Sequence, residues 1–102
     1  MEWYHYFSAF WAGIFLANFV PHFVNGMSGN KFPTVFSKPR GQGLSSPTLN
    51  VLWALFNLIV GFFLFRFAGI SMDNNLALLF FLLGIALISI RLSKRFSTKE
   101  IE

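Results

Sequence analysis

Three long apolar stretches, in a chain of only 102 residues, are the feature that most constrains how this sequence can fold. They run over about 3–24, 47–65 and 76–92, and none contains Asp, Glu, Lys or Arg until Arg91. A helix that crosses the hydrocarbon core of a bilayer needs about 20 residues, at about 1.5 Å per residue. We therefore predict an all-α fold, a three-helix transmembrane bundle, in which residues 1–102 form a single integral membrane domain.

The composition agrees with a lipid environment. Apolar residues make up 55% of the chain and charged residues 12%, whereas soluble domains carry about 25% charged residues. The absence of cysteine excludes disulfides, thiolate metal sites and thiol nucleophiles. The N-terminus has no Lys or Arg before its apolar stretch, unlike a secretory signal, so we expect this stretch to be a retained helix.

The basic residues indicate an orientation. With three spans, the first loop and the C-terminal flank share one side of the membrane, and the N-terminus shares the other side with the second turn. The side of the membrane that holds the first loop and the C-terminal flank carries Lys31, Lys38, Arg40, Arg91, Lys94, Arg95 and Lys99. The other side carries Arg66 alone. The positive-inside rule then predicts that the N-terminus is outside and the C-terminus is cytoplasmic.

Local signals mark the ends of the predicted helices. Ser45 or Ser46 can cap the second helix, with Pro47 in its first turn, and residues 73–75 offer caps for the third. Pro21 lies inside the first apolar stretch and has no N–H, so it predicts a kink or an early stop there.

The loop over residues 26–46 is rich in Gly and Pro and is the only sizeable polar region. It also holds Phe32, Val35 and Phe36, which a fully solvated loop would not need. We expect an interfacial loop that uses these side chains as anchors and its basic residues as contacts for anionic lipid headgroups. The candidate headgroup contacts are Lys31, Lys38 and Arg40.

Four polar residues are predicted inside the membrane. Asn18 and His22 share a face of the first helix, and Asn50 and Asn57 share a face of the second. The rise per residue places Asn18 and Asn57 at similar depths, so the two sets can meet. One interpretation is hydrogen bonding between helices, and the other is a hydrated path open to the inner side. A role for His22 as a proton acceptor would need a partner that the nearby sequence does not supply.

Small residues recur on another face of the first helix, at Ala9, Gly13 and Ala17. Such residues let helix backbones approach closely in lipid, where no hydrophobic effect drives association. This helix-packing stripe can serve contacts within one chain or between chains. Because it lies opposite the polar face, it favours an oligomer.

One segment carries a resemblance. The run PHFVNGMSGNKFPTVF over residues 21–36, followed by GLSSP over 43–47, resembles a group of small uncharacterised bacterial inner-membrane proteins. The resemblance covers about a quarter of the chain and bridges the first two helices. It implies a bacterial inner-membrane location, and it brings no activity with it.

The sequence thus predicts a non-enzymatic accessory or interaction protein whose inner loop contacts anionic lipid. The predicted partners are membrane lipid and either further copies of the chain or a larger membrane protein, with no nucleic acid. No catalytic, metal or cofactor-binding residues are predicted, and no cofactor. The alternative is a subunit of a small oligomeric channel or transporter with a polar path in the inner half of the membrane. A lipid-acting enzyme that uses His22 is a further rival.

Overall fold

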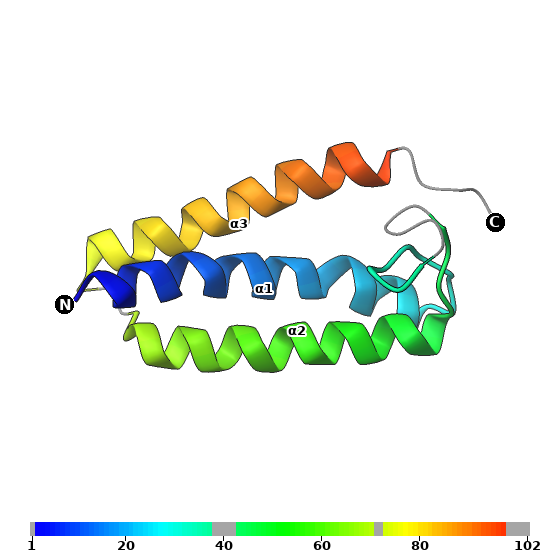
Figure 1. Cartoon of the computed structure of the whole chain (residues 1–102), viewed down its shortest axis with the longest axis horizontal. Helices are drawn as coiled ribbons and strands as arrows, with labels where there is room; N and C mark the ends of the chain where they lie inside the picture. The colour runs from blue at the N-terminus through cyan, green and yellow to red at the C-terminus, as the bar shows by residue number, and fades with distance from the viewer. Residues whose placement is uncertain (1, 38–42, 71–72, 98–102) are drawn as a thin grey trace.

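The computed structural model describes residues 2–37, 43–70 and 73–97, and it confirms the predicted three-helix, all-α architecture. The helices are α1 (Trp3–Met27), α2 (Pro47–Ala68) and α3 (Asn75–Phe96). They lie side by side along the 46 Å long axis of the molecule (Figure 1). Each is long and apolar enough to cross a bilayer.

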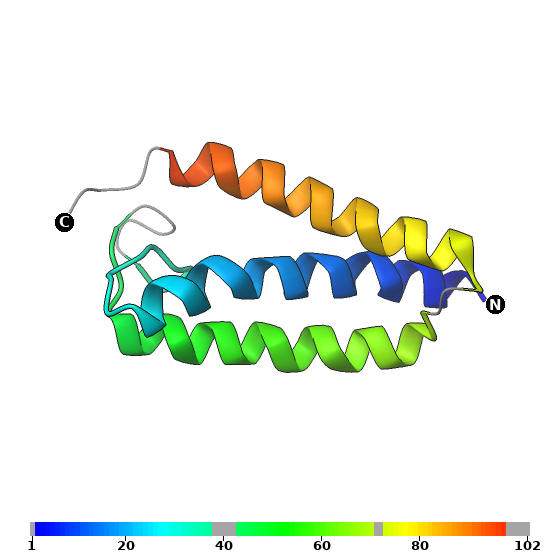
Figure 2. The ribbon, with the colours of Figure 1, turned by 180° about the vertical axis from the view of Figure 1, so that it is seen from behind.

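Helix α1 lies between the other two helices in both views of the ribbon (Figures 1 and 2). It packs against α2 and α3, whereas α2 and α3 contact each other little. One contact between these two is made by the rings of Phe65 and Phe81, whose centroids are 5.4 Å apart. Helix α3 runs close to α1 at its start and diverges from it toward the C-terminus (Figure 1).

Two predicted caps are confirmed. The side-chain oxygen of Ser46 accepts a hydrogen bond from the N–H of Leu49 (3.1 Å), and that of Asn74 accepts one from Ala77 (3.1 Å). Helix α2 ends where Gly69 adopts the left-handed conformation, at φ 64°, which favours glycine. The side-chain oxygen of Ser45 instead contacts the loop described below.

The early stop that Pro21 allowed does not occur. Helix α1 continues through Pro21 to Met27. The side-chain amide of Asn25 donates to the Pro21 carbonyl at 2.8 Å, one turn further along. A proline weakens a helix only locally, and packing against α2 supports the following turn: a Cβ on Gly26 would lie 2.6 Å from Val51 and 2.8 Å from the Pro47 carbonyl.

Glycines mark the closest approach of α1 and α3. A Cβ added to Gly13 would collide with the backbone oxygen of Phe81, and one added to Gly84 would collide with that of Phe10. The two backbones therefore touch directly at this crossing, which is the packing that small residues allow in membranes. Within the stripe predicted on α1, Ala9 and Gly13 are buried, while Ala17 is only partly covered because α3 has moved away at its level.

Candidate functional site at the loop end of the bundle

The end of the bundle that holds residues 28–37 and 43–46 is called the loop end below. The loop there is folded onto the helices. Phe32 and Ser45 form an antiparallel bridge, with N–H to carbonyl distances of 3.2 and 3.0 Å. Phe32, Pro33, Thr34 and Ser37 are all buried. The loop therefore closes the end of the α1–α2 pair.

Hydroxyl groups hold this loop together. The side-chain oxygen of Ser45 lies 2.8 Å from those of both Thr34 and Ser37. The backbone N–H of Thr34 donates to the Ser37 hydroxyl at 2.8 Å, and that of Phe36 donates to the Thr34 hydroxyl at 3.1 Å. Such mutual pairing satisfies polar groups that would otherwise be costly to bury.

Asn50 joins the loop to both helices. Its side-chain N–H groups donate to the carbonyls of Phe32 (2.9 Å), Ser45 (3.3 Å) and Ser46 (3.0 Å). Its side-chain oxygen lies 2.8 Å from Nδ1 of His22. Asn50 is fully buried and His22 is 2% exposed. This pair therefore fixes the loop, α1 and α2 at one point.

The loop departs from its predicted role at Phe32. We expected Phe32, Val35 and Phe36 all to act as membrane anchors. Val35 and Phe36 are exposed, but Phe32 is buried, and its ring centroid lies 4.6 Å from that of Phe96 and 5.5 Å from that of His22. The bridge to Ser45 turns Phe32 inward, and a hydropathy pattern cannot show this.

The other two intramembrane amides also meet. The Asn18 side-chain N–H donates to the Asn57 oxygen at 3.1 Å, and the Asn57 N–H donates to the Trp53 carbonyl at 2.8 Å. The four predicted polar residues are therefore brought together as two separate pairs, Asn18 with Asn57 and His22 with Asn50. Among the described residues, no buried side-chain nitrogen or oxygen lacks a hydrogen-bond partner.

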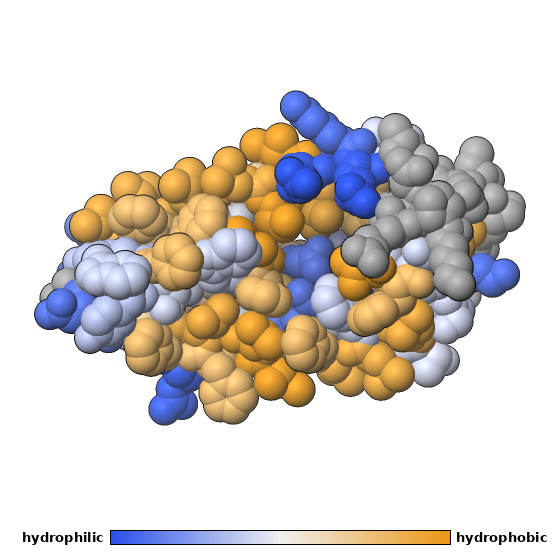
Figure 3. All heavy atoms as spheres, viewed as in Figure 1, coloured by the Kyte–Doolittle hydropathy of each residue, from blue (hydrophilic) through white to orange (hydrophobic). Residues whose placement is uncertain are grey.

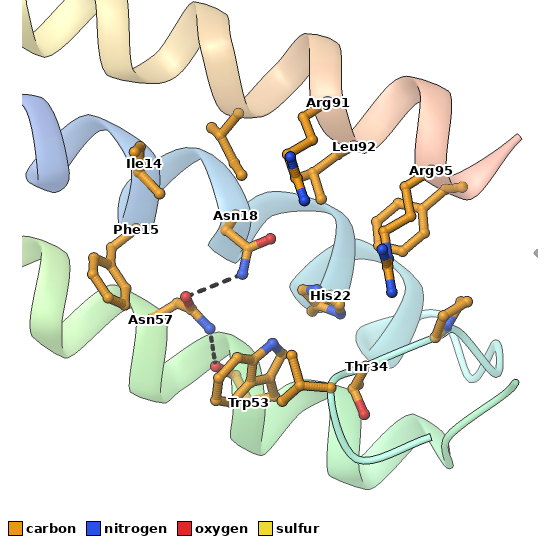
Figure 4. A pocket seen from close by; sticks show the side chains of 14 residues that line it. Ile14, Phe15, Asn18, His22, Thr34, Trp53, Asn57, Arg91, Leu92 and Arg95 are labelled. Carbon is orange, nitrogen blue, oxygen red and sulfur yellow. Dashed lines mark hydrogen bonds between the residues drawn. The ribbon is translucent and has the colours of Figure 1, made fainter. Parts of the chain in front are cut away.

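A cavity of about 300 Å³ lies beside these pairs, where α3 diverges from α1. Asn18, His22 and Asn57 contribute to its wall, and Arg91 and Arg95 of α3 reach toward it from the opposite side (Figure 4). The space-filling view shows a hollow near the loop end with hydrophilic atoms at its base (Figure 3).

Arg91 and Arg95 were expected only as charges flanking the third helix, and their place in this site was not predicted. Their i, i+4 spacing, which puts both on one face of a helix, is the signal that was available.

The remaining candidate residues fall as follows. Lys31 is exposed on the loop, while Lys38 and Arg40 lie outside the described residues. Gly13 packs against α3 within the chain, as described above. Within 2–37, 43–70 and 73–97, no group of three His, Asp or Glu side chains is arranged to hold a metal ion.

The class of protein follows from the helices. Their outward faces carry large apolar side chains, such as Phe63 (66% exposed) and Leu79 (60% exposed), along all three spans. A soluble protein rarely exposes a continuous apolar surface of this extent. The chain is a small integral membrane protein. No protein-family model, no curated protein and no solved structure matches it significantly.

Proposed function

We propose that this chain is a non-enzymatic accessory protein of the bacterial inner membrane that holds anionic lipid at its loop end. The observation that supports this most is the distribution of charge. The described part of the loop end carries Lys31, Arg91, Lys94 and Arg95 and no acidic residue, whereas Glu2 and Asp73 lie at the opposite end with Arg66. Basic residues near an anionic surface contribute about 1 kcal/mol each.

The folded loop supports the same proposal. Its hydroxyl and amide contacts fix the backbone over residues 32–37, so the outward side chains of Val35 and Phe36 are held at one level. Lys31, four residues before Val35, is also exposed. Apolar side chains beside a cation suit the boundary between headgroups and acyl chains.

The lipid-holding role is tested by replacing Lys31, Lys38 and Arg40 together with Gln. The triple variant should retain less anionic lipid through purification than the unchanged protein, as measured by native mass spectrometry. Arg66→Gln, at the opposite end, is the matched control and should retain lipid normally. Unchanged retention in the triple variant, with the orientation intact, would contradict lipid contact by the loop and would argue that the loop docks on protein.

The orientation is part of the proposal. An N-terminus outside and a cytoplasmic C-terminus place the loop on the anionic inner surface. Single cysteines at Asn30 and Asn74, at opposite ends of the bundle, should react with impermeant reagents from opposite sides of the membrane. Reaction from the same side would contradict a three-span topology.

The alternative, a subunit of an oligomeric channel or transporter, would need a polar path through the rest of the membrane. Beyond Asn18, toward the N-terminus, α1 presents Ala12 and Gly13 to its neighbours. The next polar side chain is Ser8, whose hydroxyl donates to the Tyr4 carbonyl at 2.7 Å. This arrangement favours packing over a path. Association with further copies or with a larger membrane protein stays a prediction, since Gly13 is already used within the chain.

A further inference from the structure

The cavity at the loop end combines features of a ligand site. Its apolar wall includes Ile14, Phe15 and Ile88, and its polar side includes Asn18 and His22. It is also bordered by both α2 and α3, which contact each other little. A molecule already in the bilayer can therefore enter from the side, without passing through water.

The hydrogen bonds of Asn50 decide what His22 offers to this cavity. The Asn50 nitrogen donates to three carbonyls, which fixes the orientation of its amide and leaves its oxygen as an acceptor. Nδ1 of His22, 2.8 Å from that oxygen, must therefore carry a hydrogen. In the neutral ring Nε2 then has a lone pair and accepts hydrogen bonds. His22 thus brings an acceptor to the cavity wall.

Asn18 brings a second acceptor. Asn57 donates to the Trp53 carbonyl, so its oxygen faces Asn18 and receives the Asn18 N–H. The oxygen of Asn18 is left pointing away from Asn57 on the cavity side (Figure 4). No described residue donates a hydrogen bond to it. Asn18 therefore adds an acceptor to the wall at α1, beside the second N–H of its own amide that Asn57 does not use.

The opposite side of the cavity has the reverse character. Arg91 and Arg95 lie one turn apart on α3, and both guanidinium groups point toward the cavity (Figure 4). A guanidinium has five N–H donors and suits phosphate oxygens. A ligand must therefore combine an anionic group for α3, hydrogen-bond donors for α1, and apolar chains.

From this complementarity we propose that the cavity binds one anionic phospholipid with a hydroxyl-bearing headgroup, of the phosphatidylglycerol type. Its phosphodiester would meet Arg91 and Arg95, its glycerol hydroxyls would donate to Asn18 and to Nε2 of His22, and its chains would lie along the apolar wall. A headgroup ammonium could also donate, but it would be repelled by the two arginines. A free carboxylate or phosphate at α1 would face the lone pair of Nε2 of His22. This inference deepens the lipid-holding function proposed above and rests on it.

The test compares two lipids of equal charge. Phosphatidylglycerol and phosphatidylethanol differ in the headgroup hydroxyls, and their binding to the purified full chain can be compared by native mass spectrometry in mixed micelles. We expect phosphatidylglycerol to bind about tenfold more tightly, the effect of roughly one to two net hydrogen bonds. Asn18→Leu and His22→Phe should each reduce this preference while the helical content, followed by circular dichroism, stays unchanged. If either variant unfolds, the comparison in the unchanged protein still decides.

Charge is tested separately. Arg91→Gln should weaken the binding of both lipids by similar factors. Lys94→Gln removes the same charge from the same helix, but outside the cavity, and should weaken their binding less. Equal binding of the two lipids by the unchanged protein would overturn the inference and leave the general lipid-holding function intact. Displacement of the lipid by glycerol 1-phosphate alone would also overturn it, by assigning the site to a water-soluble ester. Normal lipid retention by the loop variant, in contrast, would remove the loop from the lipid-holding function and would leave the two-lipid comparison to decide the cavity, because Lys31, the one of the three loop residues that the structure describes, does not line it.

Discussion

Helix α1 has two neighbours and meets them in different ways. Toward α2 it is closed at several levels, by the contact between Gly61 and Leu16, by the amide pair of Asn18 and Asn57, and by the pair of His22 and Asn50. Toward α3 the tight contact is at Gly13 and Gly84, and a cavity follows. In lipid, apolar contact alone has little directional preference. Paired polar groups therefore fix the α1–α2 interface, whereas the small residues fix the α1–α3 interface only where they lie.

The strongest test of the α1–α2 interface is Asn50→Leu. The change leaves Nδ1 of His22 without its partner and removes the side-chain hydrogen bonds to the carbonyls of Phe32, Ser45 and Ser46, each of which keeps a backbone N–H donor. One buried group without a partner costs about 1–3 kcal/mol and each lost hydrogen bond about 1 kcal/mol, so we expect a loss of about 3 kcal/mol or more in unfolding free energy, measured by steric trapping in bicelles.

Asn25→Leu is the matched control for Asn50→Leu. It removes one local hydrogen bond, to the Pro21 carbonyl, and should cost about 1 kcal/mol. Equal losses in the two variants would show that Asn50 does not organise the loop end.

The next largest effect is expected where α1 crosses α3. In Gly84→Ala the new methyl group meets the backbone oxygen of Phe10, which cannot move without shifting the helix. In Gly61→Ala it meets the side chain of Leu16 at 2.7 Å, which can adopt another rotamer, and the Leu16 backbone nitrogen only at 3.2 Å. We expect Gly84→Ala to cost about 1–3 kcal/mol and Gly61→Ala less, by the same unfolding measurement.

Ala86→Leu, on the outward face of α3, supplies the baseline for added volume and should be close to neutral. A larger loss of unfolding free energy for Gly61→Ala than for Gly84→Ala would contradict this prediction. It would mean that the α1–α2 interface has less room for a methyl group than the α1–α3 interface.

A smaller effect is expected for the amide pair. Asn18→Leu and Asn57→Leu should each cost on the order of 1 kcal/mol, and a double-mutant cycle should give a coupling of about 0.6 kcal/mol. The double Leu variant should keep the fold, because both partners are then replaced by apolar groups. A coupling near zero would mean that the 3.1 Å contact contributes no stability.

The smallest effect is expected in a labelling experiment, in which a cysteine at position 57 should stay unmodified. Asn57 is 1% exposed and packs beneath Asn18, so a water-soluble thiol reagent should not modify Asn57→Cys in the intact membrane. A cysteine at the exposed position Asn30 is the positive control. Rapid modification at position 57 from the loop side would support the channel alternative.

The apolar runs and caps predicted three helices, and the depth argument placed Asn18 level with Asn57. In the structure Asn18 and Asn57 are in contact. Consecutive spans are antiparallel neighbours, so distance from the shared loop end sets the depth of each residue. The helix ends were less accurate: α2 extends past Phe65 to Ala68, where Gly69 supplies the stop, and α3 extends to Phe96.

The inward side of the loop and the cavity could not be predicted in the same way. Phe32 is buried because it pairs with Ser45, 13 residues away, across a loop whose composition suggested only an interface position. The cavity depends on where α3 parts from α1. That point is set by the meeting of Gly13 with Gly84, and each of these glycines taken alone is uninformative about its partner.

The crossing at Gly13 and Gly84 also makes α3 a lever. Phe96 lies about 18 Å beyond this pivot, so a tilt of roughly 10° moves it by about 3 Å, enough to separate its ring from Phe32. The contact between the rings of Phe32 and Phe96 then holds the C-terminal end of α3 in place. Because helices tilt to match the thickness of the surrounding bilayer, a change in thickness would form or break this contact. The width of the cavity would in this way report the thickness of the membrane around it.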